Sequence, residues 1–200
     1  MKYSILTIFS TLAISLPHGA TSTPTPPSLT YLGTANITLS PPVPVGPGPR
    51  GSRNFFPITN GSFTGPLFSG MQDPLPLPSL PATKLTTPKA SIPSYGGDWS
   101  LGDGAAGTFY VDARYQLHTT DGVDIYVEAN GPQQPEEGVV HTRVKFETGN
   151  AKYYWLNNVV GVGIVTPGPG NGYIVVELWR VLTLGEAREG KGKGKGKGRK

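Results

Sequence analysis

The sequence predicts an all-β domain, either an antiparallel barrel or a sandwich of about seven or eight short strands. From Gly96 onward, short runs rich in Val, Ile, Tyr and Phe are separated by Gly, Pro or Asn, which is the pattern of strands joined by turns. No long segment after the N-terminal apolar run has the 3.6-residue periodicity of an amphipathic helix. Together these observations favour strands over helices along most of the chain.

The strand-like segments follow one another along the chain. Two precede the central proline-rich stretch, at residues 29–40 and 54–68, and the second is expected to break at Asn60-Gly61. The segments after Gly96 lie at 98–101, 107–118, 123–129, 139–148, 159–166 and 173–184. Residues 150–157, NAKYYWLN, are the one segment typical of a helical turn.

Residues 110–127, YVDARYQLHTTDGVDIYV, predict a hairpin whose register follows from its pattern. A three-residue loop, Thr120-Asp121-Gly122, puts Gly122 at the left-handed position that such loops need and pairs apolar positions with apolar positions. His118 then opposes Asp124, and Arg114 opposes Glu128. One face is apolar, while the other, which carries Asp112 and Arg114, either meets water or lines the lumen of a barrel.

Both ends of the chain differ in composition from this domain. Residues 1–20 combine Lys2, a short apolar run and small residues near Ala20, which predicts a secretory signal peptide and not a transmembrane segment. Residues 21–28 are a Pro/Thr-rich linker, and residues 29–185 are the expected barrel domain. Six prolines within 71–95 predict an insertion without regular structure, and residues 186–200 predict a disordered Lys/Gly tail.

The basic charge of the chain belongs to its tail. The net charge is +4, but residues 191–200 contribute six positive charges and no negative ones, which leaves −2 on the rest. The sequence therefore predicts no sequence-specific nucleic-acid face. The tail is either a solvated end or a tether to a polyanion.

The composition also bears on metals, cofactors and modification. There is no cysteine, and only His118 and His141 remain after signal removal, so neither a metal site nor a cofactor is predicted. Asn36 and Asn60 lie in sequons, which predicts N-glycosylation of a secreted eukaryotic protein.

Three quoted segments carry a resemblance to a known family. They are GPRGSRNFFPITNGSFTGP, GGDWSLGDGAAGTFYVDARYQLHTTDGVDIYV and FETGNAKYYWLNNVVGVG. In this order they resemble the family catalogued as domain of unknown function 3237, over residues 29–184, and the chain looks like a secreted fungal member. The resemblance implies a single antiparallel β-barrel of the calycin or allene-oxide-cyclase kind, with about seven to nine short strands. The chain departs from the family at the insertion, at His141 and at Asn60.

The barrel implied by this resemblance favours placing the polar face of the hairpin inside a cavity. The candidate ligand-binding residues are then Arg53, Asp98, Trp99, Arg114, Tyr126 and Trp155. The candidate catalytic residues are Asp112, Arg114, His141 and Glu147, where the carboxylates or His141 would move a proton and Arg114 would pair with a carboxylate or enolate.

Two functions are compatible with these residues. The first is a secreted barrel that binds a small apolar or aromatic molecule in a polar-lined lumen, as a binding protein or as a cofactor-free isomerase, cyclase or lyase. The second is a non-enzymatic secreted protein that acts through its surface and is held on polyanions by its tail. An open, polar-lined cavity larger than about 300 Å³ would favour the first, and a closed apolar core the second.

Overall fold

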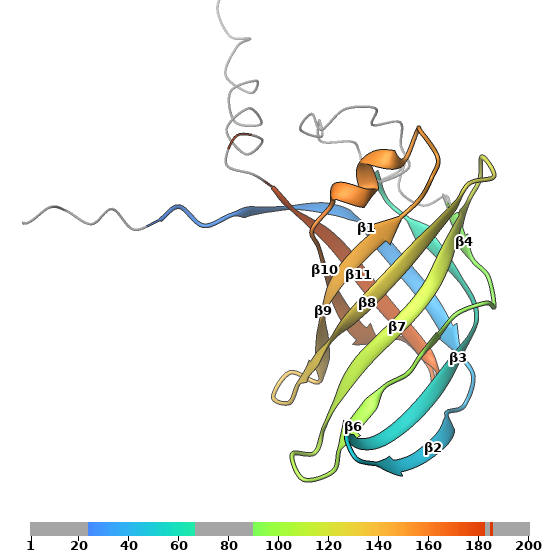
Figure 1. The fold of residues 1–200 in the computed structure, drawn as a ribbon, viewed down its shortest axis with the longest axis vertical. Helices are drawn as coiled ribbons and strands as arrows, with labels where there is room; N and C mark the ends of the chain where they lie inside the picture. The colour runs from blue at the N-terminus through green and yellow to red at the C-terminus, as the bar shows by residue number, and fades with distance from the viewer. Residues whose placement is uncertain (1–23, 67–89, 183–184, 186–200) are drawn as a thin grey trace, which may run out of the picture.

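The chain folds into a closed antiparallel β-barrel in the computed structural model, which describes residues 24–66, 90–182 and 185 (Figure 1). The predicted signal peptide, the tail and most of the proline-rich insertion lie outside the described residues. The strands are β1 (Ser28–Leu39), β2 (Val43–Gly48), β3 (Gly51–Thr64), β4 (Ala90–Ile92), β5 (Gly97–Asp98), β6 (Leu101–Asp103), β7 (Thr108–Thr119), β8 (Asp124–Gln134), β9 (Val139–Glu147), β10 (Gly161–Pro167) and β11 (Tyr173–Leu182). One short 3₁₀ helix, η3 (Tyr154–Asn158), lies in the segment predicted as a helical turn.

The order of the strands closes the barrel. Neighbours run β1-β11-β10-β9-β8-β7-β4-β3-β2, and β1 also pairs with β3. The short strands β4, β5 and β6 share one position in the wall, because each pairs with both β3 and β7. The wall therefore has eight strand positions, which confirms the predicted all-β barrel. Within the described residues no helix is long and apolar enough to span a membrane.

The β7–β8 hairpin has the register that the sequence predicts. Arg114 opposes Glu128 and His118 opposes Asp124, and the imidazole Nδ1 lies 2.8 Å from the Asp124 carboxylate. Gly122 has φ +80°, a conformation that favours glycine and turns the chain back. Apolar alternation and one glycine were sufficient to fix this pairing.

Two local predictions are wrong. Residues 90–92 of the predicted insertion form β4, because Ala90 and Ile92 are buried in the core between β3 and β7. β3 also runs unbroken through Asn60-Gly61. The irregularity appears instead as a register shift against β1, between the pairs Thr38–Asn60 and Leu39–Ile58, which leaves Thr59 as an extra residue.

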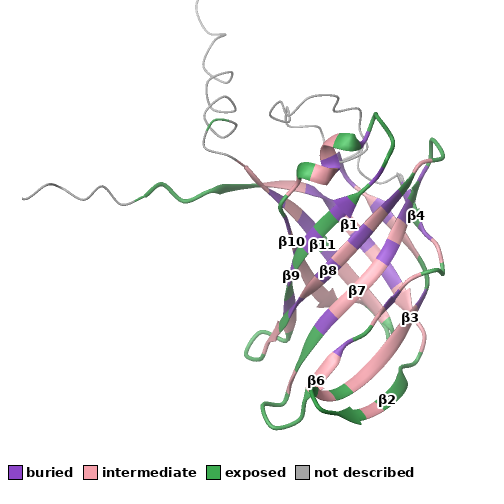
Figure 2. Ribbon diagram, viewed as in Figure 1, coloured by how far each residue is buried: buried purple, intermediate pink, exposed green. Residues whose placement is uncertain are grey.

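The interior of the barrel differs between its two ends. We call the end beneath η3 the filled half, because side chains from β1, β3, β4, β7, β8, β9 and β11 meet there and Leu156 of η3 packs onto them. Figure 2 shows more buried positions toward this end, and exposed loops at both ends of the barrel. The residues of the filled half are Leu32, Ala35, Phe63, Ala90, Ile92, Leu117, Ile125, Val127, Val144, Phe146, Tyr153, Leu156 and Leu178.

A polar contact fastens the β7–β8 loop to η3 and its approach. Asp121 of the loop accepts a hydrogen bond from the Lys152 ammonium at 2.6 Å. It also accepts from the Tyr153 hydroxyl at 2.9 Å and 3.1 Å. Tyr153 is 4% exposed, so this contact satisfies a buried hydroxyl and fixes the closed end of the barrel.

Candidate functional site

The half of the barrel opposite η3, the open half, contains a cavity of about 350 Å³. Its wall is largely apolar, so the prediction of a polar-lined lumen is wrong. A second cavity of about 570 Å³ adjoins it at the mouth, since both are lined by Leu39, Phe56, Phe109, Val140, Val165 and Ile174. The polar residues that line the inner cavity are Asn54, Asp98, Ser100, Tyr115 and Thr142. A mostly apolar space with a few placed polar groups is typical of a small-molecule site.

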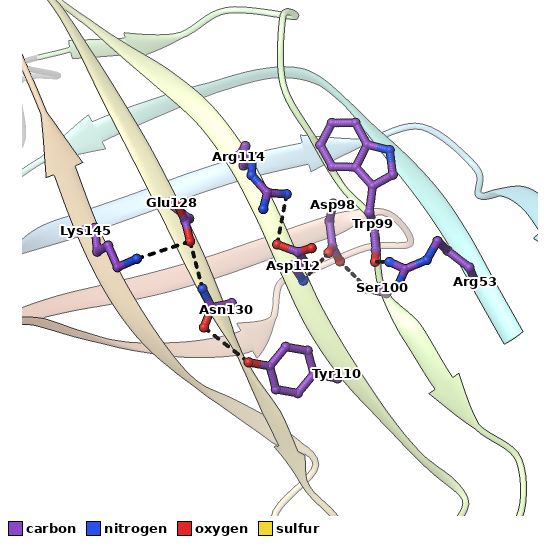
Figure 3. A network of polar contacts seen from close by, with 10 residues as sticks. All are labelled: Arg53, Asp98, Trp99, Ser100, Tyr110, Asp112, Arg114, Glu128, Asn130 and Lys145. Atoms are coloured by element: carbon purple, nitrogen blue, oxygen red, sulfur yellow. Dashed lines mark hydrogen bonds and ion pairs between the residues drawn. The ribbon is translucent and has the colours of Figure 1, made fainter. Parts of the chain in front are cut away.

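Asp98 is the one carboxylate among the described lining residues of the inner cavity. Its Oδ1 accepts a hydrogen bond from the backbone N–H of Asp112 at 2.8 Å, and its Oδ2 accepts from the Ser100 hydroxyl (Figure 3). Burial raises the pKa of the Asp98 carboxyl above its ordinary 3.8, and the two hydrogen bonds oppose that rise. A fixed carboxyl with a raised pKa is suited to moving a proton.

The pair Gly96-Gly97 lets the chain bring Asp98 to this place. A Cβ at Gly96 would lie 2.5 Å from the carbonyl oxygen of Arg114, and one at Gly97 would lie 2.1 Å from the ring of Phe55. Glycine therefore permits β5 to lie close to both β3 and β7. The strand pairing then sets Asp98 opposite Ala113, on the lumen side.

The other polar groups of the cavity differ in how they are satisfied. The Thr142 hydroxyl donates to the carbonyl oxygen of Gly163 at 3.2 Å. Tyr115 is 4% exposed, and its hydroxyl has no hydrogen-bond partner in the part of the chain that the structure describes. Burial raises the pKa of the Tyr115 phenol, so it stays a neutral hydrogen-bond donor.

The polar face of the β7–β8 hairpin does not line the cavity, and that prediction is wrong. Val111, Ala113 and Tyr115 point into the lumen, so the alternate residues of β7 point outward. Arg114 is 42% exposed and pairs with Asp112 at 3.0 Å on the outer wall. Glu128 also lies on this outer surface, where it bonds Asn130 and Lys145 (Figure 3).

The remaining candidates from the neighbouring strands also lie outside the lumen. Tyr126 shares the outer face of β8 with Glu128. His141 and Glu147 are exposed positions of β9 that alternate with the buried Val140, Thr142, Val144 and Phe146. The catalytic candidates Asp112, Arg114, His141 and Glu147 are thus all absent from the residues that line the cavity.

Three further candidates have other structural surroundings. Arg53 donates from Nη1 to the carbonyl oxygen of Trp99 at 2.6 Å, and the Trp99 ring packs on Phe55 with centroids 4.7 Å apart. Trp99 is 36% exposed and Trp155, on η3, packs on the core of the filled half. Of the predicted ligand-binding residues, the structure brings only Asp98 to the cavity.

Four residues that line the cavity were not predicted from the sequence, namely Asn54, Ser100, Tyr115 and Thr142. The signal that could have found Tyr115 is its place in the apolar alternation of the hairpin, where a hydroxyl interrupts a series of hydrocarbon side chains. Among the described residues no group of three or more His, Cys, Asp or Glu side chains could hold a metal ion.

The chain is similar in sequence to a known family and to a fungal enzyme. The sequence profile of the family described as "Protein of unknown function (DUF3237)" matches residues 27–181. A Penicillium herquei protein named hydroalkoxylation enzyme phnH is 29% identical over 181 residues, which cover 90% of this chain and 99% of that protein. This fungal relative supports the fungal character expected from the sequence.

Solved structures of other proteins share this fold. The crystal structure of an enzyme from Penicillium herquei has a TM-score of 0.59 and 28% identity, and covers 80% of this chain and 98% of that one. A β-barrel-like protein from Acinetobacter baumannii has a TM-score of 0.60 at 24% identity, and covers 80% and 99% of the two chains. The second likeness bears on the fold alone.

Proposed function

The chain belongs to the DUF3237 family, and we propose that it is an enzyme that adds a hydroxyl group across a carbon–carbon double bond. The substrate is a small, largely apolar molecule bound in the open half of the barrel. One observation carries the proposal: a carboxyl group, Asp98, is held by two hydrogen bonds in the wall of an apolar cavity. The name of the Penicillium herquei relative supports the type of reaction.

The size of the cavity supports small-molecule chemistry over a purely surface-acting protein. Ligand sites span about 300–1,000 Å³, and the inner cavity has about 350 Å³ before the mouth is added. Its lining favours an apolar ligand with few polar atoms. A barrel that acted only through its outer surface would have no need to keep this half hollow.

The reaction balances without an oxidant, a reductant or a second substrate when both groups belong to one molecule. The hydroxyl oxygen bonds to one carbon of the double bond, and its proton passes to the other carbon. One O–H bond and one π bond are lost, and one C–O bond and one C–H bond form. Asp98 as carboxylate takes the hydroxyl proton and then returns it to carbon.

The test uses two substrates that close a ring by this addition, 2′-hydroxychalcone and 2-allylphenol. The wild-type chain should form one enantiomer of at least one cyclic product in excess over the uncatalysed reaction. Asp98→Asn should lower kcat/KM about 10²- to 10⁴-fold, because it removes the proton carrier but keeps an acceptor oxygen. Glu147→Gln, which neutralises an exposed carboxylate of the outer wall, should not change the rate.

The pH dependence sharpens the assignment. A base must be ionised, so kcat/KM should fall as the pH falls through the pKa of Asp98. Burial raises that pKa, so the fall should begin at a higher pH than for an ordinary aspartate, and it should be absent in Asp98→Asn. Racemic product from both substrates at the uncatalysed rate would overturn the proposed function.

A further inference from the structure

Two tyrosines are buried inside this barrel to the same extent, and their hydroxyl groups have different surroundings. Tyr153, in the filled half, is 4% exposed and donates its hydroxyl to Asp121. Tyr115, at the inner end of the cavity, is also 4% exposed, and its hydroxyl has no hydrogen-bond partner among the described residues. A buried hydroxyl that bonds nothing costs folding free energy, and a phenylalanine would fill the same space without that cost.

Tyr115 lies where the packed interior of the barrel meets the cavity. Toward η3 the next lumen-facing residue of β7 is the fully buried Leu117, and toward the mouth are Ala113 and Val111, which line the cavity. Tyr115 therefore forms the boundary between packed core and open space. Asp98 lies beside Ala113 through the β5–β7 pairing, one lumen-facing position nearer the mouth.

A second polar group besides the carboxyl would ease the addition. A carboxylic acid protonates an isolated double bond only over a high barrier, and the addition is easier when the double bond itself is made electrophilic. A carbonyl conjugated to it does this when a hydrogen-bond donor stabilises the charge that develops on its oxygen. The Tyr115 phenol is a neutral donor in a dry site, where such a bond is strongest. Its hydroxyl oxygen is fully buried in the ligand-free barrel, so the ring must shift toward the cavity that it lines to make this bond.

We propose that Tyr115 donates a hydrogen bond to a carbonyl oxygen of the ligand, and that the substrate class is a hydroxyl-bearing α,β-unsaturated ketone. This inference rests on the proposed function. The hydroxyl oxygen attacks the β-carbon while Asp98 takes its proton, and the π electrons move through the α-carbon to the carbonyl oxygen bound by Tyr115. The enolate then takes the same proton from Asp98 at the α-carbon, the carbonyl is restored, and the product is an isomer of the substrate.

A binding experiment tests the hydrogen bond apart from any reaction. The probes are α-tetralone and tetralin, which share a two-ring skeleton and differ by the carbonyl oxygen, and neither can cyclise. Calorimetry on the full chain should show that the wild type prefers α-tetralone, and that Tyr115→Phe weakens α-tetralone binding roughly tenfold and leaves tetralin binding unchanged. Tyr110→Phe is the matched control, because the Tyr110 hydroxyl bonds Asn130 on the outer wall.

The outcomes separate the two proposals. No preference of the wild type for α-tetralone, or equal α-tetralone affinity in the wild type and Tyr115→Phe, overturns the role of Tyr115. Enantioselective cyclisation of 2-allylphenol but not of 2′-hydroxychalcone overturns the enone class and leaves the hydroxyl addition intact. Tyr115-dependent α-tetralone binding together with no turnover of either phenol supports the hydrogen bond and overturns the proposed enzyme.

Discussion

The filled half and the open half of the barrel share the long strands β1, β3, β7, β8, β9 and β11 and the same alternating pattern, and along β7 and β8 they differ in the size of the side chains that point inward. Along β7 and β8 the filled half receives Leu117 and Ile125, whereas the open half receives Ala113 and Ala129. Alternation decides which face of a strand enters the lumen, and residue volume decides whether the lumen is packed or hollow. The two halves therefore differ in role, since one holds the fold and the other contains the cavity of the proposed site.

The largest expected effect lies in the packing of the filled half. Leu117→Ala should lower the free energy of unfolding by about 2–5 kcal/mol, because Leu117 is 0% exposed and its neighbours cannot collapse into the space. Ile174→Ala removes as many carbon atoms from the wall of the cavity and should cost about 1–2 kcal/mol, because Ile174 is only partly buried. Chemical denaturation measures both values, and equal losses would contradict the division into two halves.

The two buried tyrosines give an intermediate effect. Tyr153→Phe removes a hydroxyl that bonds Asp121 and should cost about 0.5–1.5 kcal/mol of stability. Tyr115→Phe removes a hydroxyl that bonds no described residue and should leave the stability of the ligand-free protein unchanged or higher. Thermal melts of the two variants side by side test this, and a clear loss of stability in Tyr115→Phe would show that its hydroxyl is already satisfied.

The smallest effect is expected on the outer wall. Arg114→Ala should cost less than about 1 kcal/mol, since the Arg114–Asp112 pair is largely solvated and exposed pairs contribute little. The melting temperature of the Arg114→Ala variant should depend on salt no more strongly than that of the Lys145→Ala variant, which loses the 3.6 Å ion pair between Lys145 and Glu128. A loss of several kcal/mol in Arg114→Ala would place this arginine in a role that its exposure does not predict.

The strand pattern was sufficient for the all-β class and for the local pairing of the hairpin, and the family resemblance was needed to choose the barrel over a sandwich. Apolar alternation and Gly122 determine the register of β7 and β8, and both are local features of the chain. Whether the polar face of the hairpin points into the lumen or outward could not be predicted from the hairpin alone, because it depends on which face the other strands cover. The apolar face of Val111, Ala113 and Tyr115 in fact lines the cavity.

The candidate site was predictable only in part. Asp98 was selected from the GGDW segment, and the two glycines explain its approach to the lumen. Ser100, Tyr115 and Thr142 reach the same cavity from strands whose proximity results from barrel closure, which no single segment encodes. β4 was missed for a similar reason, since three residues become a strand only when β3 and β7 already flank them.

The contact of Asp121 with Lys152 and Tyr153 has a consequence for behaviour in acid. The hydrogen bond from Lys152 is the largest cause that holds the pKa of Asp121 well below its ordinary 3.8. A carboxyl whose pKa is lowered by folding contributes stability above its unfolded pKa and loses that contribution only as the pH falls through the folded value. The fastening of η3 should therefore persist in solutions acidic enough to protonate an ordinary aspartate, so that acid does not release the closed end of the barrel first.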